Sequence, residues 1–166
     1  MTEEQQFWDV IEMTLKHHTL EDDIAYDEFL HDQLKKKQVK DVVGFQLRLI
    51  ELRRTLDSFE IIKTAQVLGF YSSREVFNRF CNGIVASGKS FYYNVKDNPE
   101  FIKTLLKEEP VNLRYCYYEG FSLIAPNVFH EKEGNDADWV SALKNTQRLS
   151  ELNKDKAYDS EMDQEL

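Results

Sequence analysis

The sequence predicts an all-α protein, a compact multi-helix bundle of about six to eight helices with an acidic, disordered C-terminal tail. Three observations predict this fold class. Apolar residues recur at spacings of three and four along most of the chain, which places them on one face of a helix. Residues that start or stop helices separate these apolar runs. No turn dipeptide stands between runs of alternating apolar residues, so β-hairpins are not expected.

The first three helices are predicted from capping residues, charge and apolar spacing. Thr2 and Gln5 form a capping box, so a helix is expected over residues 3–17. A second helix is expected over 21–36, because its acidic residues lie early and lysines close it, which suits the helix dipole. The third helix, over 40–56, has the most regular apolar spacing, formed by Val42, Phe45, Leu49, Leu52 and Leu56.

Glycines and a second capping box define the next two helices. Gly69 is the expected end of a helix that starts near Phe59, because glycine adopts the left-handed conformation common at helix C-termini. Ser72 and Glu75 form the second capping box, and Gly88 is the expected end of the helix that follows.

The rest of the domain is predicted from prolines and aromatic residues. A short aromatic segment covers residues 91–93, and Asn98-Pro99 predicts a helix start that Pro110 terminates. The tyrosine-rich segment 111–124 has a mixed pattern that slightly favours a helix. The Ala-Pro-Asn sequence at 125–127 is expected to break it, because proline disrupts helix interiors.

Composition divides the chain into a helical domain, residues 1–130, and an acidic extension, residues 131–166. The extension holds ten acidic and five basic residues. One amphipathic helix is expected over 137–152. Beyond residue 153 almost nothing is apolar, so a disordered tail is expected.

The overall charge and the cysteines limit the class of protein. Lys and Arg number 21 against 30 Asp and Glu, a net charge of −9, so a nucleic-acid partner is not expected. No apolar run approaches the roughly 20 residues of a membrane span, so no membrane contact is expected. The polar, acidic start has no secretory signal, which predicts a cytoplasmic protein. Cys81 and Cys116 fit no metal or disulfide spacing and are expected to be reduced core residues.

Residues 83–90 satisfy G-x-x-x-x-G-K-S, the pattern of a phosphate-binding loop. Such a loop follows a buried strand and precedes a long helix, whereas here an amphipathic helical pattern precedes it and about two turns follow. We therefore interpret Gly88 as the end of a helix and Lys89 as a cation beside its carbonyl groups. Nucleotide binding through residues 83–90 is the less favoured alternative.

The candidate interaction or pocket residues are three tyrosines and one arginine, because tyrosine combines apolar area with a hydroxyl. They are Tyr92, Tyr115, Tyr118 and Arg79. The alternative is that the tyrosines pack in the core with their hydroxyls reaching solvent. No catalytic residue, cofactor or metal site is identified. The histidines form no i, i+4 pair, and a cluster of His17, His18 and Asp22-Asp23 is better explained as a polar helix end.

Several segments together carry a family resemblance. They are Gly69–Phe80, Ile84–Lys89 and Asn98-Pro99, with Phe7-Trp8 in the first helix. Their residues and spacing resemble a bacterial domain family of unknown function, numbered four-two-four-zero among such families, over about residues 4–130. The resemblance implies a mainly helical cytoplasmic protein, and it brings no catalytic residue because the family has no established activity.

The leading functional hypothesis is a small protein-interaction or regulatory module. Its acidic and aromatic surface would bind another protein, with a basic surface as the favoured partner, and an immunity or antitoxin role is one specific form. The alternative is a small-ligand-binding protein or enzyme with an interhelical pocket. Catalysis and oligomeric state are left open by the sequence.

Overall fold

The computed structural model describes residues 3–108 and 120–164 of the chain. These residues form nine α-helices and no β-strand, which confirms the all-α prediction. The helices are α1 Glu3–His17, α2 Asp23–Lys35, α3 Val39–Leu56, α4 Phe59–Leu68, α5 Arg74–Ala86, α6 Lys89–Asp97, α7 Glu100–Glu108, α8 Phe121–Glu133 and α9 Trp139–Gln164. Eight of them, α1 to α8, agree with the expected six to eight, and α9 corresponds to the further helix expected over 137–152. The aromatic segment at 91–93 belongs to a full helix, α6.

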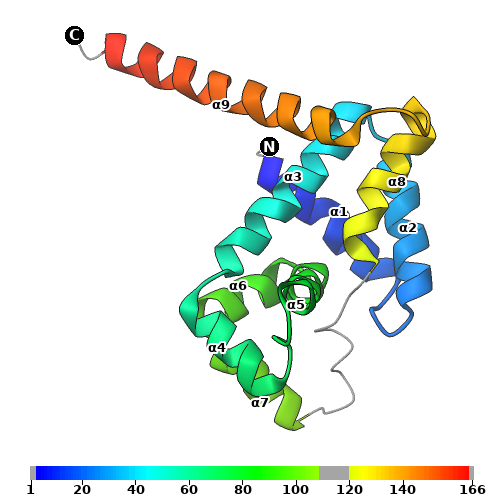
Figure 1. Cartoon of the computed structure of the whole chain (residues 1–166), viewed down its shortest axis with the longest axis vertical. Helices are drawn as coiled ribbons and strands as arrows, with labels where there is room; N and C mark the ends of the chain where they lie inside the picture. Colours follow the sequence, from blue (N-terminus) through cyan, green and yellow to red (C-terminus); the bar gives the residue numbers. More distant parts are fainter. Residues whose placement is uncertain (1–2, 109–119, 165–166) are drawn as a thin grey trace.

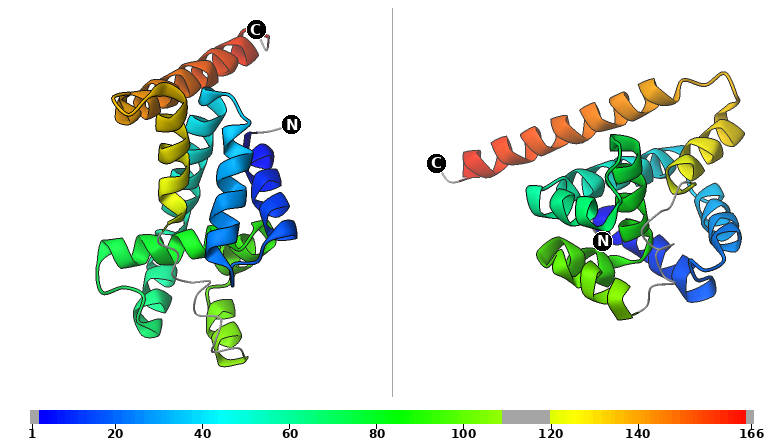
Figure 2. Two further views of the ribbon diagram at one scale, coloured as in Figure 1. Left: turned by 90° about the vertical axis from the view of Figure 1, so that its right-hand side faces the viewer. Right: turned by 60° about the horizontal axis from the view of Figure 1, so that its bottom comes forward.

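The helices form a bundle with a layer at each end (Figure 1). α1, α2, α3 and α8 lie side by side and contact one another, and α3 with α8 and α2 with α8 are the most extensive pairs. α4 to α7 pack below this bundle, mainly through α5 against α3 and α6 against α1. α9 lies across the opposite end, where it contacts α3 and α8 (Figure 2).

An aromatic cluster joins the four helices of the bundle. Phe7 of α1 stacks on Phe45 of α3 with ring centroids 4.5 Å apart, and Phe45 meets Phe121 of α8 at 6.3 Å. Tyr26 of α2 lies 6.5 Å from Phe121. Tyr26, Phe121 and the neighbouring Trp8 are fully buried. Aromatic rings bury large areas, so this cluster fixes where α2 and α8 meet.

Two buried tyrosine hydroxyls have partners. The Tyr26 hydroxyl donates to the carbonyl of Ala86 at 3.0 Å, and the Tyr92 hydroxyl donates to the carbonyl of Leu52 at 2.8 Å. Burial raises the pKa of both phenols, so both stay protonated donors. The bonds connect α2 to the end of α5, and α6 to α3.

The break predicted at residues 125–127 is wrong, because α8 continues through Pro126. Proline lacks the N–H that would bond the carbonyl of Ser122 four residues earlier. The side-chain amide of Gln46, on α3, lies 3.4 Å from that carbonyl and donates to it. α3 therefore supplies a hydrogen-bond donor in place of the N–H that Pro126 lacks.

The ends of α1 to α5 agree with the prediction to within about two residues. Gly69 ends α4 in the left-handed conformation, with φ 84°, and its N–H bonds the carbonyl of Ala65 as predicted. The cap of α5 is Ser73 rather than the expected Ser72, and its hydroxyl accepts from the N–H of Val76 at 3.2 Å. The Asn98-Pro99 start is also displaced, since Asn98 caps the end of α6 and α7 begins at Glu100.

Cys81 lies in the core on α5, as predicted, with 1 % of its surface exposed. Burial raises the pKa of its thiol to about 12, so the thiol is protonated at neutral pH. Cys116 and most of the tyrosine-rich segment fall outside the described residues.

The C-terminal region differs in length from the prediction. α9 extends from Trp139 to Gln164, past the expected end at residue 152. Trp139 anchors it on α8, with its ring 5.0 Å from that of Phe129. α8 runs through the boundary expected at residue 130. The division into two domains and the disorder of the tail stay predictions. None of the described helices has the length and apolar character of a membrane span.

Candidate functional site

A cleft of about 490 Å³ opens between α2 and α8, which lie side by side in Figure 1. We call it the α2–α8 cleft. Its walls are acidic on α2 and largely apolar on α8. The lining residues are Asp27, Glu28, His31, Asp32, Gly120, Leu123, Ile124 and Asn127.

The periodicity of α2 decides which side chains reach the cleft. Asp22 caps the helix, and its carboxylate accepts from the N–H of Ala25 at 3.1 Å. Tyr26 and Leu30, four residues apart, are fully buried and fix this face of α2 against the core. The residue after each of them, Asp27 and His31, therefore lies at the edge of the core and lines the cleft.

The opposite wall comes from the first turns of α8. Phe121 and Ala125 anchor the helix in the core, and Ile124 is 6 % exposed. Leu123 is 57 % exposed and also lines the cleft. The cleft thus combines an accessible apolar surface with the carboxylates of α2.

Asp27 is the least satisfied group of the cleft. Its Oδ1 atom is buried and has no hydrogen-bond partner in the described part of the chain. Its Oδ2 atom lies beside Gly120, where an added Cβ would approach it to 2.9 Å. Burial, followed by repulsion from Asp23, raises the pKa of Asp27 to about 6. At neutral pH this carboxylate is mostly charged, and its buried Oδ1 atom lacks a donor among the described residues.

Charged residues at the rim of the cleft pair with one another. Nε2 of His31 lies 2.7 Å from Glu131 of α8, and Nζ of Lys35 lies 3.1 Å from the same carboxylate. Hydrogen bonds from His31 and then Lys35 hold the pKa of Glu131 below its usual range. In contrast, Asp27 and Glu28 form no ion pair with any described residue. The uncompensated negative charge lies inside the cleft.

The two predicted pocket residues that the structure describes, Tyr92 and Arg79, do not line this cleft. Tyr92 is 1 % exposed and lies in the core on α6. Arg79 lies on α5 and its Nη2 is 2.6 Å from Glu75 one turn earlier. Tyr115 and Tyr118 lie outside the described residues, so their convergence with Arg79 stays a prediction.

The Gly83–Ser90 pattern forms a helix corner. Its first four residues are buried in the last turn of α5, and the Ser87 hydroxyl donates to the carbonyl of Gly83 at 2.7 Å. The backbone N–H of Lys89 donates to Glu12 at 2.8 Å, and its ammonium donates to Gln5 at 3.2 Å. The Glu12 carboxylate therefore occupies a backbone N–H that a phosphate-binding loop would offer to a phosphate. Lys89 opens α6, and does not sit at the end of α5 as expected.

Histidines away from the cleft pack on an aromatic ring. The rings of His17 and His18 lie 4.8 Å and 5.3 Å from that of Phe29. In the described ranges, no three His, Cys, Asp or Glu side chains are grouped as a metal site requires.

The acidic face of α2 is visible in the sequence, but its position opposite α8 is not. Asp27 and Glu28 are among the acidic residues early in the helix expected over 21–36, whereas nothing in the local pattern places Leu123 or Gly120 beside them. The two walls are almost a hundred positions apart, so only packing brings them together.

Comparison with known families gives one match. A family model described as "Protein of unknown function (DUF4240)" matches residues 1–131. No curated protein matches the chain. No solved structure matches it either.

Proposed function

Because this chain belongs to the family of unknown function DUF4240, which supplies no activity, we propose a function from the α2–α8 cleft itself. The protein is an interaction module that binds a basic partner protein. One Lys or Arg side chain of the partner enters the cleft and pairs with Asp27.

The observation that carries this proposal is the buried Oδ1 atom of Asp27, for which the described residues supply no donor. A buried acceptor without a partner costs free energy, and a donor that reaches it recovers that cost. A cationic donor also compensates the charge that burial disfavours, as the raised pKa of Asp27 indicates. An ammonium or guanidinium group supplies both the hydrogen bond and the charge.

The walls of the cleft fit the rest of such a side chain. Lys and Arg carry apolar stems that pack on apolar surface while the charged end reaches a polar partner. The exposed Leu123 offers that surface on α8. Glu28 and Asp32 extend the negative charge along α2, which speeds association with a basic protein. An immunity or antitoxin protein that covers a basic surface would use these features.

A direct test uses two short peptides that differ only in charge. The NMR signals of Asp27 and Leu123 are followed while the protein is titrated with acetyl-Leu-Arg-Leu-amide or with its citrulline analogue. We expect shifts at the cleft with the arginine peptide and at least tenfold weaker binding with the uncharged analogue. Equal shifts with both peptides would contradict a charge-based site.

A matched pair of variants assigns the effect to Asp27. Asp27→Asn keeps the shape and removes the charge, and we expect it to weaken binding of the arginine peptide at least tenfold. Glu21→Gln removes one charge from an exposed position before α2 and serves as the control. Equal losses in the two variants would mean that net charge, not the cleft, attracts the peptide.

The volume of the cleft favours one alternative, a small cationic ligand. About 490 Å³ lies in the range of small-molecule sites. Spermidine is a suitable probe in a thermal-shift assay. Stabilisation by spermidine in the wild type, lost in Asp27→Asn and absent with the arginine peptide, would favour this alternative.

A further inference from the structure

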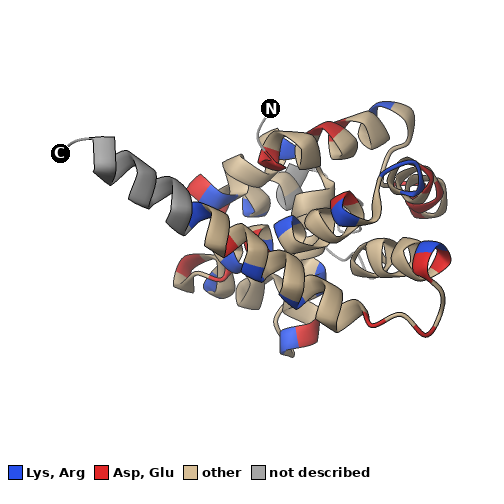
Figure 3. Ribbon diagram, turned by 90° about the horizontal axis from the view of Figure 1, so that it is seen from above, with Lys and Arg blue, Asp and Glu red and all other residues tan. Residues whose placement is uncertain are grey.

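The last helix has an uneven distribution of charge. Residues 139–154 of α9 contain three bases, Lys144, Arg148 and Lys154, and one acid, Glu151. Residues 155–164 of α9 contain four acids and one base. Figure 3 looks onto this end of the molecule and shows the basic residues on the first half of α9. One end of α9 is therefore basic and the other acidic.

The middle of α9 exposes leucines. Leu149 is 61 % exposed and Leu152 is 48 % exposed, and the two lie one turn apart on the same side of the helix. Single exposed apolar residues are common, and these two stand out because they are neighbours at the centre of a 26-residue helix.

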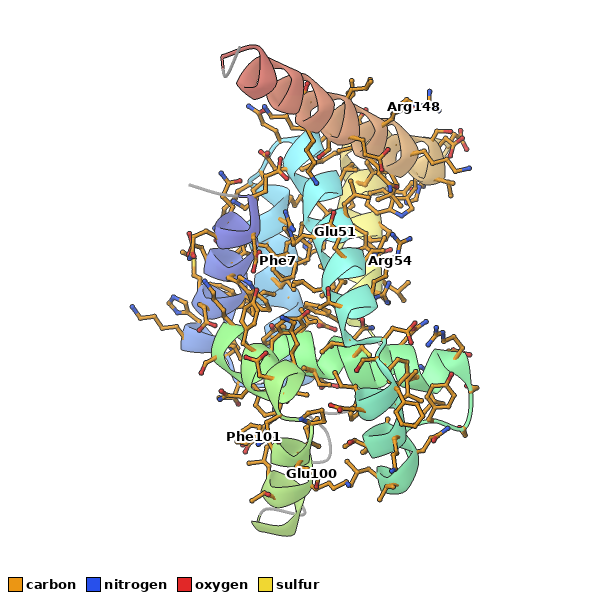
Figure 4. All side chains as sticks on the ribbon, turned by 90° about the vertical axis from the view of Figure 1, so that its left-hand side faces the viewer. Phe7, Glu51, Arg54, Glu100, Phe101 and Arg148 are labelled. Atoms are coloured by element: carbon orange, nitrogen blue, oxygen red, sulfur yellow. The ribbon has the colours of Figure 1, made fainter. Side chains whose placement is uncertain are left out.

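The basic half of α9 borders a groove of about 820 Å³ against α1 and α3, which we call the α9 groove. Five of its basic residues form no ion pair with described residues, whereas Arg48 is held by Glu51 at 2.7 Å. The five are Lys37, Lys40, Arg54, Lys144 and Lys154. Arg54 and Glu51 are labelled on α3 in Figure 4, with Arg148 on α9 above them. Six basic and four acidic residues line the groove, so it carries a local excess of positive charge in a chain of net charge −9.

We propose that two copies of this chain associate through α9, with the two helices antiparallel. A two-fold axis between Leu149 and Leu152 brings residues 155–164 of each copy alongside the first turns of α9 in the other. The acidic end of each helix then meets Lys144 and the neighbouring α9 groove, and the leucines meet at the axis. The same surface serves both copies, as two-fold symmetry requires.

The second copy fits the groove better than the chain's own C-terminus does. α9 is one continuous helix from Trp139 to Gln164, so its acidic half cannot fold back onto its basic half. An antiparallel pair satisfies both halves at once, because each acidic end finds a basic one. Charge pairing of this kind sets the orientation of paired helices.

The test exchanges charges between the two halves in the full-length chain. The groove-reversed variant carries Lys37→Glu, Lys40→Glu and Lys144→Glu, and the tail-reversed variant carries Asp159→Lys, Glu161→Lys and Asp163→Lys. Sedimentation velocity measures the dimer fraction up to about 100 µM protein. We expect a wild-type dimer that weakens at least tenfold between about 50 mM and about 500 mM salt, and monomers for each variant alone.

A one-to-one mixture of the two variants gives the decisive result. The native acidic tail of the first fits the native groove of the second, and the reversed tail fits the reversed groove. We expect the mixture to restore the dimer. A wild type that stays monomeric, variants that still dimerise alone, or a mixture that remains monomeric would each overturn the proposal.

A matched leucine pair keeps the test decisive if a charge-reversed variant fails to fold. Leu152→Asp places a charge at the proposed axis, and Leu123→Asp changes an exposed leucine of the α2–α8 cleft. We expect the first to abolish the dimer and the second to leave it intact, because Leu123 lies on α8 and not on α9. Equal effects of both variants on the dimer would refute the α9 interface without affecting the function proposed for the cleft.

Discussion

Two carboxylates in this molecule lie at the start of a helix beside a glycine, and they differ in one respect. Glu12 lies at Gly88, before α6, and Asp27 lies at Gly120, before α8. An added Cβ would come within 2.8 Å of the first carboxylate and 2.9 Å of the second. Helix N-termini favour such negative charges.

The difference is the hydrogen bond. Glu12 accepts the backbone N–H of Lys89 at 2.8 Å, whereas the buried oxygen of Asp27 accepts no hydrogen bond from any residue that the structure describes. The first arrangement closes a corner between helices and needs no ligand. The second leaves an acceptor in a cleft, which is why we assign binding to Asp27 and a structural role to Glu12.

The largest effect expected from this comparison is at the two glycines. Gly88 has φ 102°, a conformation that side chains disfavour, and Gly120 has the ordinary φ of −74°. Gly88→Ala should therefore destabilise the protein by about 2 kcal/mol. Gly120→Ala should cost less than about 1 kcal/mol, because the end of the Asp27 side chain can move away. Urea unfolding measures the loss in free energy of unfolding for both variants. Equal losses would contradict the distinction between the two glycines.

The next effect is a pH dependence caused by Asp27. Its pKa is raised to about 6 in the folded protein, above the usual 3.8, so the folded state holds the extra proton between these values. Its contribution to stability therefore falls as the pH rises from about 4 to 6, and stays constant above that. Because the side chain is only half-buried, we expect a loss of about 1 kcal/mol.

Asp27→Asn removes this titration. The free energy of unfolding of the wild type minus that of Asp27→Asn should fall between pH 4.5 and pH 7, measured by urea unfolding in buffers spanning the range. A difference that is the same at both pH values would show that Asp27 is not perturbed.

At fixed pH, substitution of the two carboxylates should have opposite signs. Glu12→Gln weakens an acceptor at the start of α6 and should destabilise the protein by about 0.5–1 kcal/mol. Asp27→Asn removes a charge that no described residue pairs with, and it should leave stability at neutral pH unchanged or slightly higher. Thermal unfolding at pH 7.5 compares them, and a clear destabilisation by Asp27→Asn would mean that its carboxylate supports the fold.

The smallest effect is expected at the rim. Glu131 pairs with His31 and Lys35 in an exposed position, and such pairs contribute little. Glu131→Gln should leave the melting temperature indistinguishable from the wild type at about 0.5 M salt, where surface charges are screened. A marked loss of melting temperature would mean that the pairs of Glu131 with His31 and Lys35 hold the cleft open.

The comparison also shows where local sequence is a poor guide to function. The Gly83–Ser90 pattern is the strongest motif in the chain, yet its residues form a helix corner tied to Glu12 and Gln5. Asp27 belongs to no motif. The reason is that the role of Asp27 depends on whether α8, a helix distant in the sequence, supplies a hydrogen-bond donor to its carboxylate.

The sequence by itself determined the all-α class, most of the helices and the stop at Gly69, because apolar spacing and capping act within one or two turns. The tertiary structure decided what depends on distant residues. Pro126 remains within α8 because Gln46 of α3 supplies a donor to the carbonyl of Ser122. The same packing of α8 on α2 creates the cleft around Asp27, since burial and hydrogen-bond partners depend on neighbours that no local pattern specifies.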